Sequence, residues 1–130
     1  MEEKLVDMIS LENGLTLELY DASKRVAGDR WLVSMVASIE VGLKPEYLKG
    51  QDSEDVLLDD IGAAMDDKAV YRYEKIRNFI AETEKDEVFK ELKQRFLDAN
   101  LRYLSSPEFP RRLILKKYQQ AHGHSLRWKG

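Results

Sequence analysis

Two groups of side chains in this sequence have the chemistry to bind a metal ion. His122 and His124 carry imidazoles, and the acidic pairs at 59–60 and 66–67 carry the carboxylate oxygens that calcium and magnesium prefer. Zinc needs three or four ligands, and no further ligand stands at a recognisable spacing from the two histidines. The acidic pairs do not follow the spacing of an EF-hand loop. The sequence therefore predicts solvated side chains at both places, with no metal site and no cofactor.

Catalytic groups are equally sparse. The chain contains no cysteine, so it has neither a thiolate nucleophile nor a disulfide framework. Both histidines lie near the C-terminus, so a Ser-His-Asp triad would need that tail to fold into a cleft. The sequence contains no phosphate-binding loop, dinucleotide fingerprint or nucleophile elbow. A pair of catalytic carboxylates has no positive support, and the residues favour a non-enzymatic protein.

The strongest electrostatic signal is a basic C-terminal segment. Residues 111–130 hold six of the 21 Lys and Arg and none of the 24 Asp and Glu. The first 110 residues therefore have 15 bases against 24 acids, so a body of net charge −9 is joined to a tail of +6. The candidate partner- or anion-binding residues are the six bases of this tail: Arg111, Arg112, Lys116, Lys117, Arg127 and Lys129.

Two interpretations of this basic segment stay open. Its cations could neutralise the phosphates of a nucleic acid while Tyr118, His122 or Trp128 stacks on the bases. The segment could instead be a packed C-terminal helix with a solvated basic face, docked on the acidic segment 46–67. The overall charge of −3 and the pI near 5.5 favour the packed helix, because nucleic-acid-binding domains are usually basic.

A second pattern combines aromatic and basic side chains. Tyr71, Tyr73 and Phe79 share one parity, and Lys75 and Arg77 lie in the same run. In broad chemistry this face resembles a sheet on which RNA bases stack. The run lacks the glycine-aromatic motif of such sheets, so packing against a long helix is the favoured interpretation.

An antiparallel sheet must position these residues. The leucines at 15, 17 and 19 alternate with polar residues, which is the pattern of a strand with one buried face. An Asn-Gly pair separates them from Leu11, which belongs to an earlier apolar run. A three-residue loop, 12–14, opposes Leu11 to Leu15 and keeps the apolar residues on one face. This loop predicts a left-handed backbone at Gly14.

Further strands and helices follow along the chain. The odd-numbered residues of 31–41 are apolar and predict a long strand, and the run 69–80 predicts another. Between the first strands and 31–41, we expect a connector, 21–30, with a turn at Ala27-Gly28-Asp29. The acidic segment 46–67 has apolar residues at helical spacing and predicts a helix over 53–66.

The clearest helix is expected over 83–104, because an apolar stripe through Phe96 recurs at helical spacing. Thr83 with Asp86 approximates a capping box at its start. The segment 109–121 is compatible with helix or strand. Pro110 in a first turn and Gly123 beyond the end favour the helix.

Strands followed by helices predict an α+β fold. We expect an antiparallel β-meander of about four strands packed against one long amphipathic helix, with an acidic helix and a C-terminal helix beside it. The length predicts one domain, 1–130, whose basic segment 111–130 could be partly mobile. The N-terminus does not resemble a signal peptide, and no apolar run is long enough to span a membrane. These features predict a soluble, cytoplasmic protein.

One long helix covers only one face of such a sheet, so the other face needs a partner or another helix. We therefore expect a small non-enzymatic protein–protein interaction module that pairs with another protein or with itself as a homodimer. The alternative function is anion or nucleic-acid binding through the basic segment 111–130.

Overall fold

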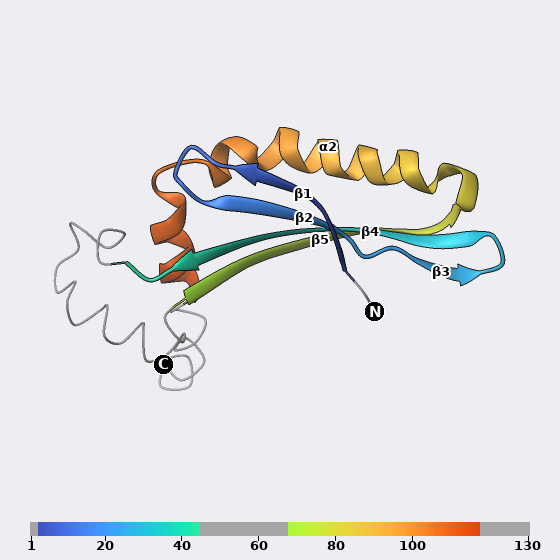
Figure 1. Cartoon of the computed structure of the whole chain (residues 1–130), viewed down its shortest axis with the longest axis horizontal. Coiled ribbons are helices and arrows are strands. Elements are labelled where there is room, and N and C mark those ends of the chain that lie inside the picture. The colour runs from blue at the N-terminus through green and yellow to red at the C-terminus, as the bar shows by residue number, and fades with distance from the viewer. Residues whose placement is uncertain (1–2, 45–67, 118–130) are drawn as a thin grey trace, which may run out of the picture. The chain divides into compact units, whose positions relative to one another are not determined.

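The computed structural model describes residues 3–44 and 68–117 of the chain (Figure 1). The elements in order are β1 (Lys4–Ser10), β2 (Thr16–Asp21), β3 (Lys24–Ala27), β4 (Arg30–Gly42), β5 (Lys68–Ala81), the 3-10 helix η2 (Glu82–Glu84) and α2 (Lys85–Leu104). Another helix begins at Phe109 and is described as far as residue 117. The predicted α+β fold is confirmed. The helix predicted over 53–66 lies outside the described residues.

The chain groups into two compact units. The first is Met1–Ile39 with Arg72–Ser105, and the second is Glu40–Tyr71 with Ser106–Gly130. Strands β4 and β5 run through both units.

Strand β4 is the centre of a five-stranded sheet, where it pairs with β2, β3 and β5. Leu17 of β2 faces Ile39, and Lys24 of β3 faces Leu32 in the same register. Between these pairs, the backbone N–H of Ala22 donates to the carbonyl of Ser34 at 3.0 Å. Strands β2 and β3 therefore behave as one strand that is interrupted next to Ala22.

The interruption has a local cause, because the carboxylate of Asp21 accepts the backbone N–H of Ser23 at 2.9 Å. Such a side-chain bond offers the backbone an alternative to the ladder. The predicted connector 21–30 is wrong in this respect, since it contains β3. Only its turn is confirmed, with Gly28 at φ 53° between β3 and β4.

The first hairpin has the predicted register. Ile9 faces Leu17, and the backbone N–H of Leu11 donates to the carbonyl of Leu15 at 2.8 Å. Gly14 closes the turn by donating to the carbonyl of Leu11 at 3.0 Å, and its φ of 87° is left-handed. The three-residue loop and the left-handed glycine are confirmed. Glycine suits this position because it adopts a positive φ without steric cost.

The core of the first unit lies on the face of the sheet formed by the odd-numbered residues of β4. Val33, Met35, Ala37 and Ile39 have no exposed surface, as the predicted strand 31–41 requires. The pairing of β2 with β4 adds the fully buried leucines 17 and 19 to this layer.

Helix α2 covers that face (Figure 1). Phe96 stacks on Tyr73 of β5 with ring centroids 4.9 Å apart, and Lys93 Nζ lies 3.0 Å from a carboxylate oxygen of Asp7. The predicted capping box of Thr83 and Asp86 is wrong. Residues 82–84 form the 3-10 helix η2, so the α-helix starts later, and its N-cap, Glu84, makes no capping hydrogen bond through its side chain.

The second unit contains the helix that begins at Phe109. Phe109, Leu113 and Ile114 are buried, and the ring of Phe109 meets Tyr71 edge-on, with centroids 5.7 Å apart. For the segment 109–121, the helix prediction is confirmed as far as residue 117, and the strand alternative is wrong there. Pro110 occupies the first turn, where a missing backbone N–H costs no helical hydrogen bond.

Candidate functional site

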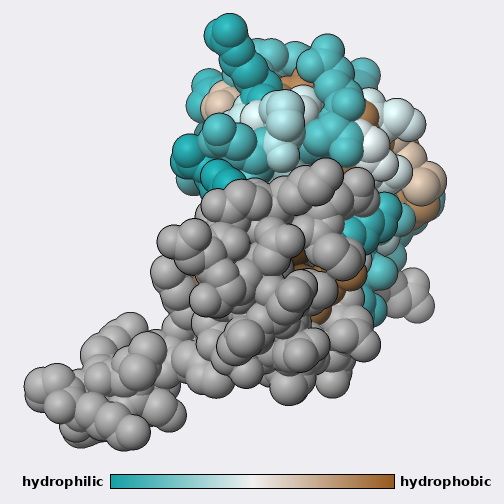
Figure 2. Space-filling view, turned by 90° about the vertical axis from the view of Figure 1, so that its left-hand side faces the viewer, coloured by the Kyte–Doolittle hydropathy of each residue, from teal (hydrophilic) through white to brown (hydrophobic). Residues whose placement is uncertain are grey.

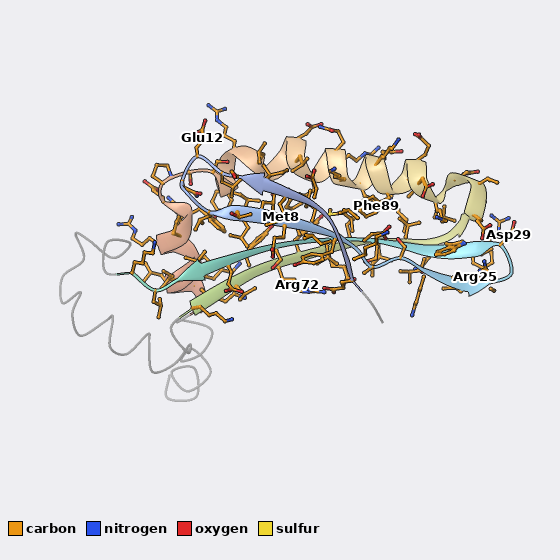
Figure 3. The ribbon with its side chains drawn as sticks, viewed as in Figure 1. Met8, Glu12, Arg25, Asp29, Arg72 and Phe89 are labelled. Carbon is orange, nitrogen blue, oxygen red and sulfur yellow. The ribbon has the colours of Figure 1, made fainter. Side chains whose placement is uncertain are left out.

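In the first unit, the sheet has a second face on the side away from α2. Side chains alternate between the two faces along a strand, and residues that face each other across strands share a face. Leu5 faces Tyr20, and Tyr20 faces Val36, so these three residues lie on the second face. The hydroxyl of Ser34 donates to a carboxylate oxygen of Glu74 at 2.8 Å, which puts Glu74 on the same face. Arg72 lies on this side of the sheet, whereas Phe89 lies between α2 and the sheet (Figure 3).

The second face holds a hollow of about 440 Å³ that is lined by polar and apolar side chains. Four of its polar residues pair with one another: Arg72 forms an ion pair with Glu3, and Glu74 accepts the Ser34 hydroxyl. The hydrogen bond from Arg72 holds the pKa of Glu3 below its usual range and raises the pKa of Arg72 itself. These contacts connect Glu3 and β4 to β5 on the second face of the sheet.

Three strands of the described sheet have a single described neighbour: β1 pairs with β2, and β3 and β5 each pair with β4. All three carry exposed apolar side chains: Leu5, Val6 and Met8 on β1, Val26 on β3, and Val70, Tyr73, Ile76 and Phe79 on β5. Met8 and Phe79 are 57% and 66% exposed, which is unusual for such large apolar side chains. On the face of the molecule that Figure 2 shows, by contrast, hydrophilic side chains cover most of the described surface.

The predicted aromatic face divides into two parts. Tyr73 stacks on Phe96, and Tyr71 packs on Phe109, so both tyrosines take part in packing. Phe79 behaves differently, because its φ of 60° breaks the alternation of the strand. Its exposed ring lies under the guanidinium of Arg30, at 5.6 Å from the centroid.

The structure describes four of the six candidate residues of the basic segment, Arg111, Arg112, Lys116 and Lys117, on the helix that begins at Phe109. Arg112 and Lys116 are exposed, and Arg112 donates to Glu108 at 2.8 Å. Arg127 and Lys129 lie outside the described residues, as do the acidic segment 46–67 and the side chains of Tyr118, His122, His124 and Trp128.

Sequence reasoning missed a polar cluster around Trp31. The indole N–H donates to Glu82 at 3.0 Å, and Lys85 Nζ lies 4.8 Å from the ring centroid. Arg25 reaches the same carboxylate at 3.3 Å, across 57 residues of sequence. No local spacing could reveal such a cluster. It ties the β3–β4 hairpin to the start of α2, and a hollow of about 490 Å³ beside it is lined in part by Lys4, Lys24 and Asp21.

Among the described residues, no group of three or more His, Cys, Asp and Glu side chains is placed to hold a metal ion. Residues 3–44 and 68–117 contain no helix that is both long and apolar enough to cross a membrane. Comparison of the chain with family models, curated proteins and solved structures found no match.

Proposed function

We propose that this chain is a small non-enzymatic protein–protein interaction module that associates with itself. One observation carries the proposal: the two longer edge strands of the described sheet present large apolar side chains to solvent, Leu5, Val6 and Met8 on β1 and Val70, Ile76 and Phe79 on β5. An edge strand offers unpaired backbone N–H and C=O groups, and these favour pairing with another chain.

Two contributions favour association at an edge strand: the burial of apolar surface and the formation of backbone hydrogen bonds. Removing exposed apolar surface from water stabilises a complex by roughly 25 cal/mol per Å², before the costs of association are subtracted. Backbone hydrogen bonds along a strand edge then give the contact a direction and a register. Natural sheets usually protect long edges, so exposed apolar residues on both edges favour a contact over a solvent-facing role.

The test is the molar mass of the full chain in solution, measured by light scattering from low to high micromolar concentration. We expect the mass to rise above the 15.1 kDa of one chain as the concentration increases. Phe79→Lys on β5 and Met8→Lys on β1 test the two edges in turn, because each puts a charge at an exposed apolar position of one edge, and the variant on the edge that pairs should weaken this rise. Tyr103→Lys is the matched control, since Tyr103 is an exposed aromatic residue that lies on α2 and belongs to no strand. A constant mass of one chain at every concentration would contradict self-association.

A further inference from the structure

Strand β5 is the longest edge strand of the described sheet. It has 14 residues, whereas strands usually have about five or six. Its residues 72–79 are all exposed, and Phe79, near the end of the strand, is its one described residue with a positive φ. Strand β1 has seven residues, and its register shifts between Leu5 and Asp7, which is a common way to protect an edge.

The charges of β5 restrict how two copies could pair there. In an antiparallel pair, residues that face each other lie on the same side of the sheet, so a symmetric pair of β5 strands is centred on one residue facing its own copy. Centring on Arg72, Glu74 or Lys75 would oppose identical charges. Centring on Ile76 would oppose Lys75 to Arg77. Within β5, those centred on residues 71, 73 and 78 are among the registers that oppose no like charges, and only the one at residue 73 puts two opposite-charge pairs next to the axis.

We propose that a second copy of this chain adds to the edge of β5 that pairs with no described strand, in antiparallel orientation, with Tyr73 facing its own copy across the two-fold axis. This proposal rests on the proposed self-association and names its surface. In this register Arg72 faces Glu74 of the second copy, and the reciprocal pair forms on the other side of the axis. The exposed Ile76 faces the exposed Val70, so apolar pairs flank the two charge pairs.

The other pairs of this register are also compatible. Lys75 faces Tyr71 of the second copy, and Arg77 faces Ala69, so each base meets an uncharged side chain. The proposed pairing is compatible with two contacts within each chain, the ion pair of Arg72 with Glu3 and the hydrogen bond of Ser34 with Glu74. Glu3 and Ser34 belong to the same chain as Arg72 and Glu74. The result is a continuous sheet through two copies, with their second faces on the same side.

A cysteine substitution tests the register directly, because the natural chain has no cysteine. Facing residues in an antiparallel pair have Cα atoms about 4.5–5.5 Å apart, which lies within the range that a disulfide spans. Tyr73→Cys in the full chain should therefore form a disulfide-linked dimer under mild oxidation. Lys75→Cys is the matched control on the same strand and the same side. It should stay unlinked, since its two copies do not face each other.

Charge exchange tests the same register without removing the Tyr73 ring that packs on Phe96. Arg72→Glu and Glu74→Arg should each weaken the dimer about tenfold, because each places two like-charged pairs across the axis. The double variant R72E/E74R restores opposite charges and should recover the affinity of the natural chain. The contact between Arg72 and Glu3 is lost in R72E and in the double variant alike, so both variants start from the same loss within the chain.

The outcomes separate this proposal from the proposed function. A dimer in which Tyr73→Cys stays unlinked, or Lys75→Cys links instead, would overturn the β5 register and leave self-association standing. Failure of the double variant to recover affinity would do the same. A chain that is monomeric at every concentration would overturn both.

Discussion

The side-chain amide of Asn13, in the turn between β1 and β2, donates to the main-chain carbonyl of Leu104 at 2.8 Å. The two residues are 91 positions apart, and Leu104 is the last residue of α2 and fully buried. The last carbonyls of a helix have no partner within the helix, so an external donor is needed where they are buried. Asn13 meets this need while its Oδ1 accepts the backbone N–H of Leu15 at 3.2 Å.

Asn13→Ala should lower the free energy of unfolding by about 1–3 kcal/mol, because it leaves a buried carbonyl without its donor. Asn13→Asp separates the two roles of the side chain. Aspartate keeps the acceptor for Leu15 but, when ionised, cannot donate to Leu104. Urea unfolding at neutral pH measures both variants. If Asn13→Asp were as stable as the natural chain, the bond to Leu104 would not contribute.

Phe96 anchors α2 to the sheet through its contact with Tyr73. Phe96→Ala should lower the free energy of unfolding by about 3–5 kcal/mol, as expected for a buried phenylalanine that leaves a cavity. Phe89→Ala on the same helix is the matched control. Phe89 is only partly buried, so the same change should cost less. A loss below about 1 kcal/mol for Phe96→Ala in urea titration would contradict the position of α2.

The ion pair of Asp7 with Lys93 should make the stability of the fold depend on pH under acid conditions. The hydrogen bond and charge of Lys93 hold the pKa of Asp7 below its ordinary value of 3.8. A carboxyl with a lowered pKa stabilises the fold above its unfolded pKa, and this contribution disappears as the pH falls through the folded pKa. Lys93→Met should raise the pKa of Asp7 toward its ordinary value, as measured by NMR titration, while the backbone N–H of Met8 still holds it down. Lys90→Met, on the same helix, should leave it unchanged.

Much of the fold could be predicted because it depends on local patterns. The register of the first hairpin follows from which residues must share a face, and the burial of β4 follows from its alternating apolar residues. Helix α2 was predictable because its apolar stripe has helical spacing. By contrast, β3 has four exposed residues and no alternation, so nothing in the sequence distinguishes it from a turn.

Of the surface features described above, only the second face of the sheet was predictable from the sequence. A single covering helix implies a second sheet face, and the structure describes that face. The sequence could not show that Trp31, Glu82 and Lys85 meet, because this contact depends on the path of the chain between distant elements. It also could not show the left-handed backbone at Phe79, which a bulky residue rarely adopts.

The basic segment is tested best by substitution, because Phe109, Leu113 and Ile114 are buried and a chain ending before them would lose packing. Arg112→Glu and Lys116→Glu change two exposed cations on the helix and leave its buried side intact. In a fluorescence-polarisation titration with single-stranded RNA and duplex DNA at low salt, we expect negligible binding by the natural chain and by both variants. The net charge of −9 on the first 110 residues opposes the approach of a phosphate backbone. Binding that the substitutions weaken, and that falls steeply with added salt, would instead favour the alternative function, since counterion release gives that dependence.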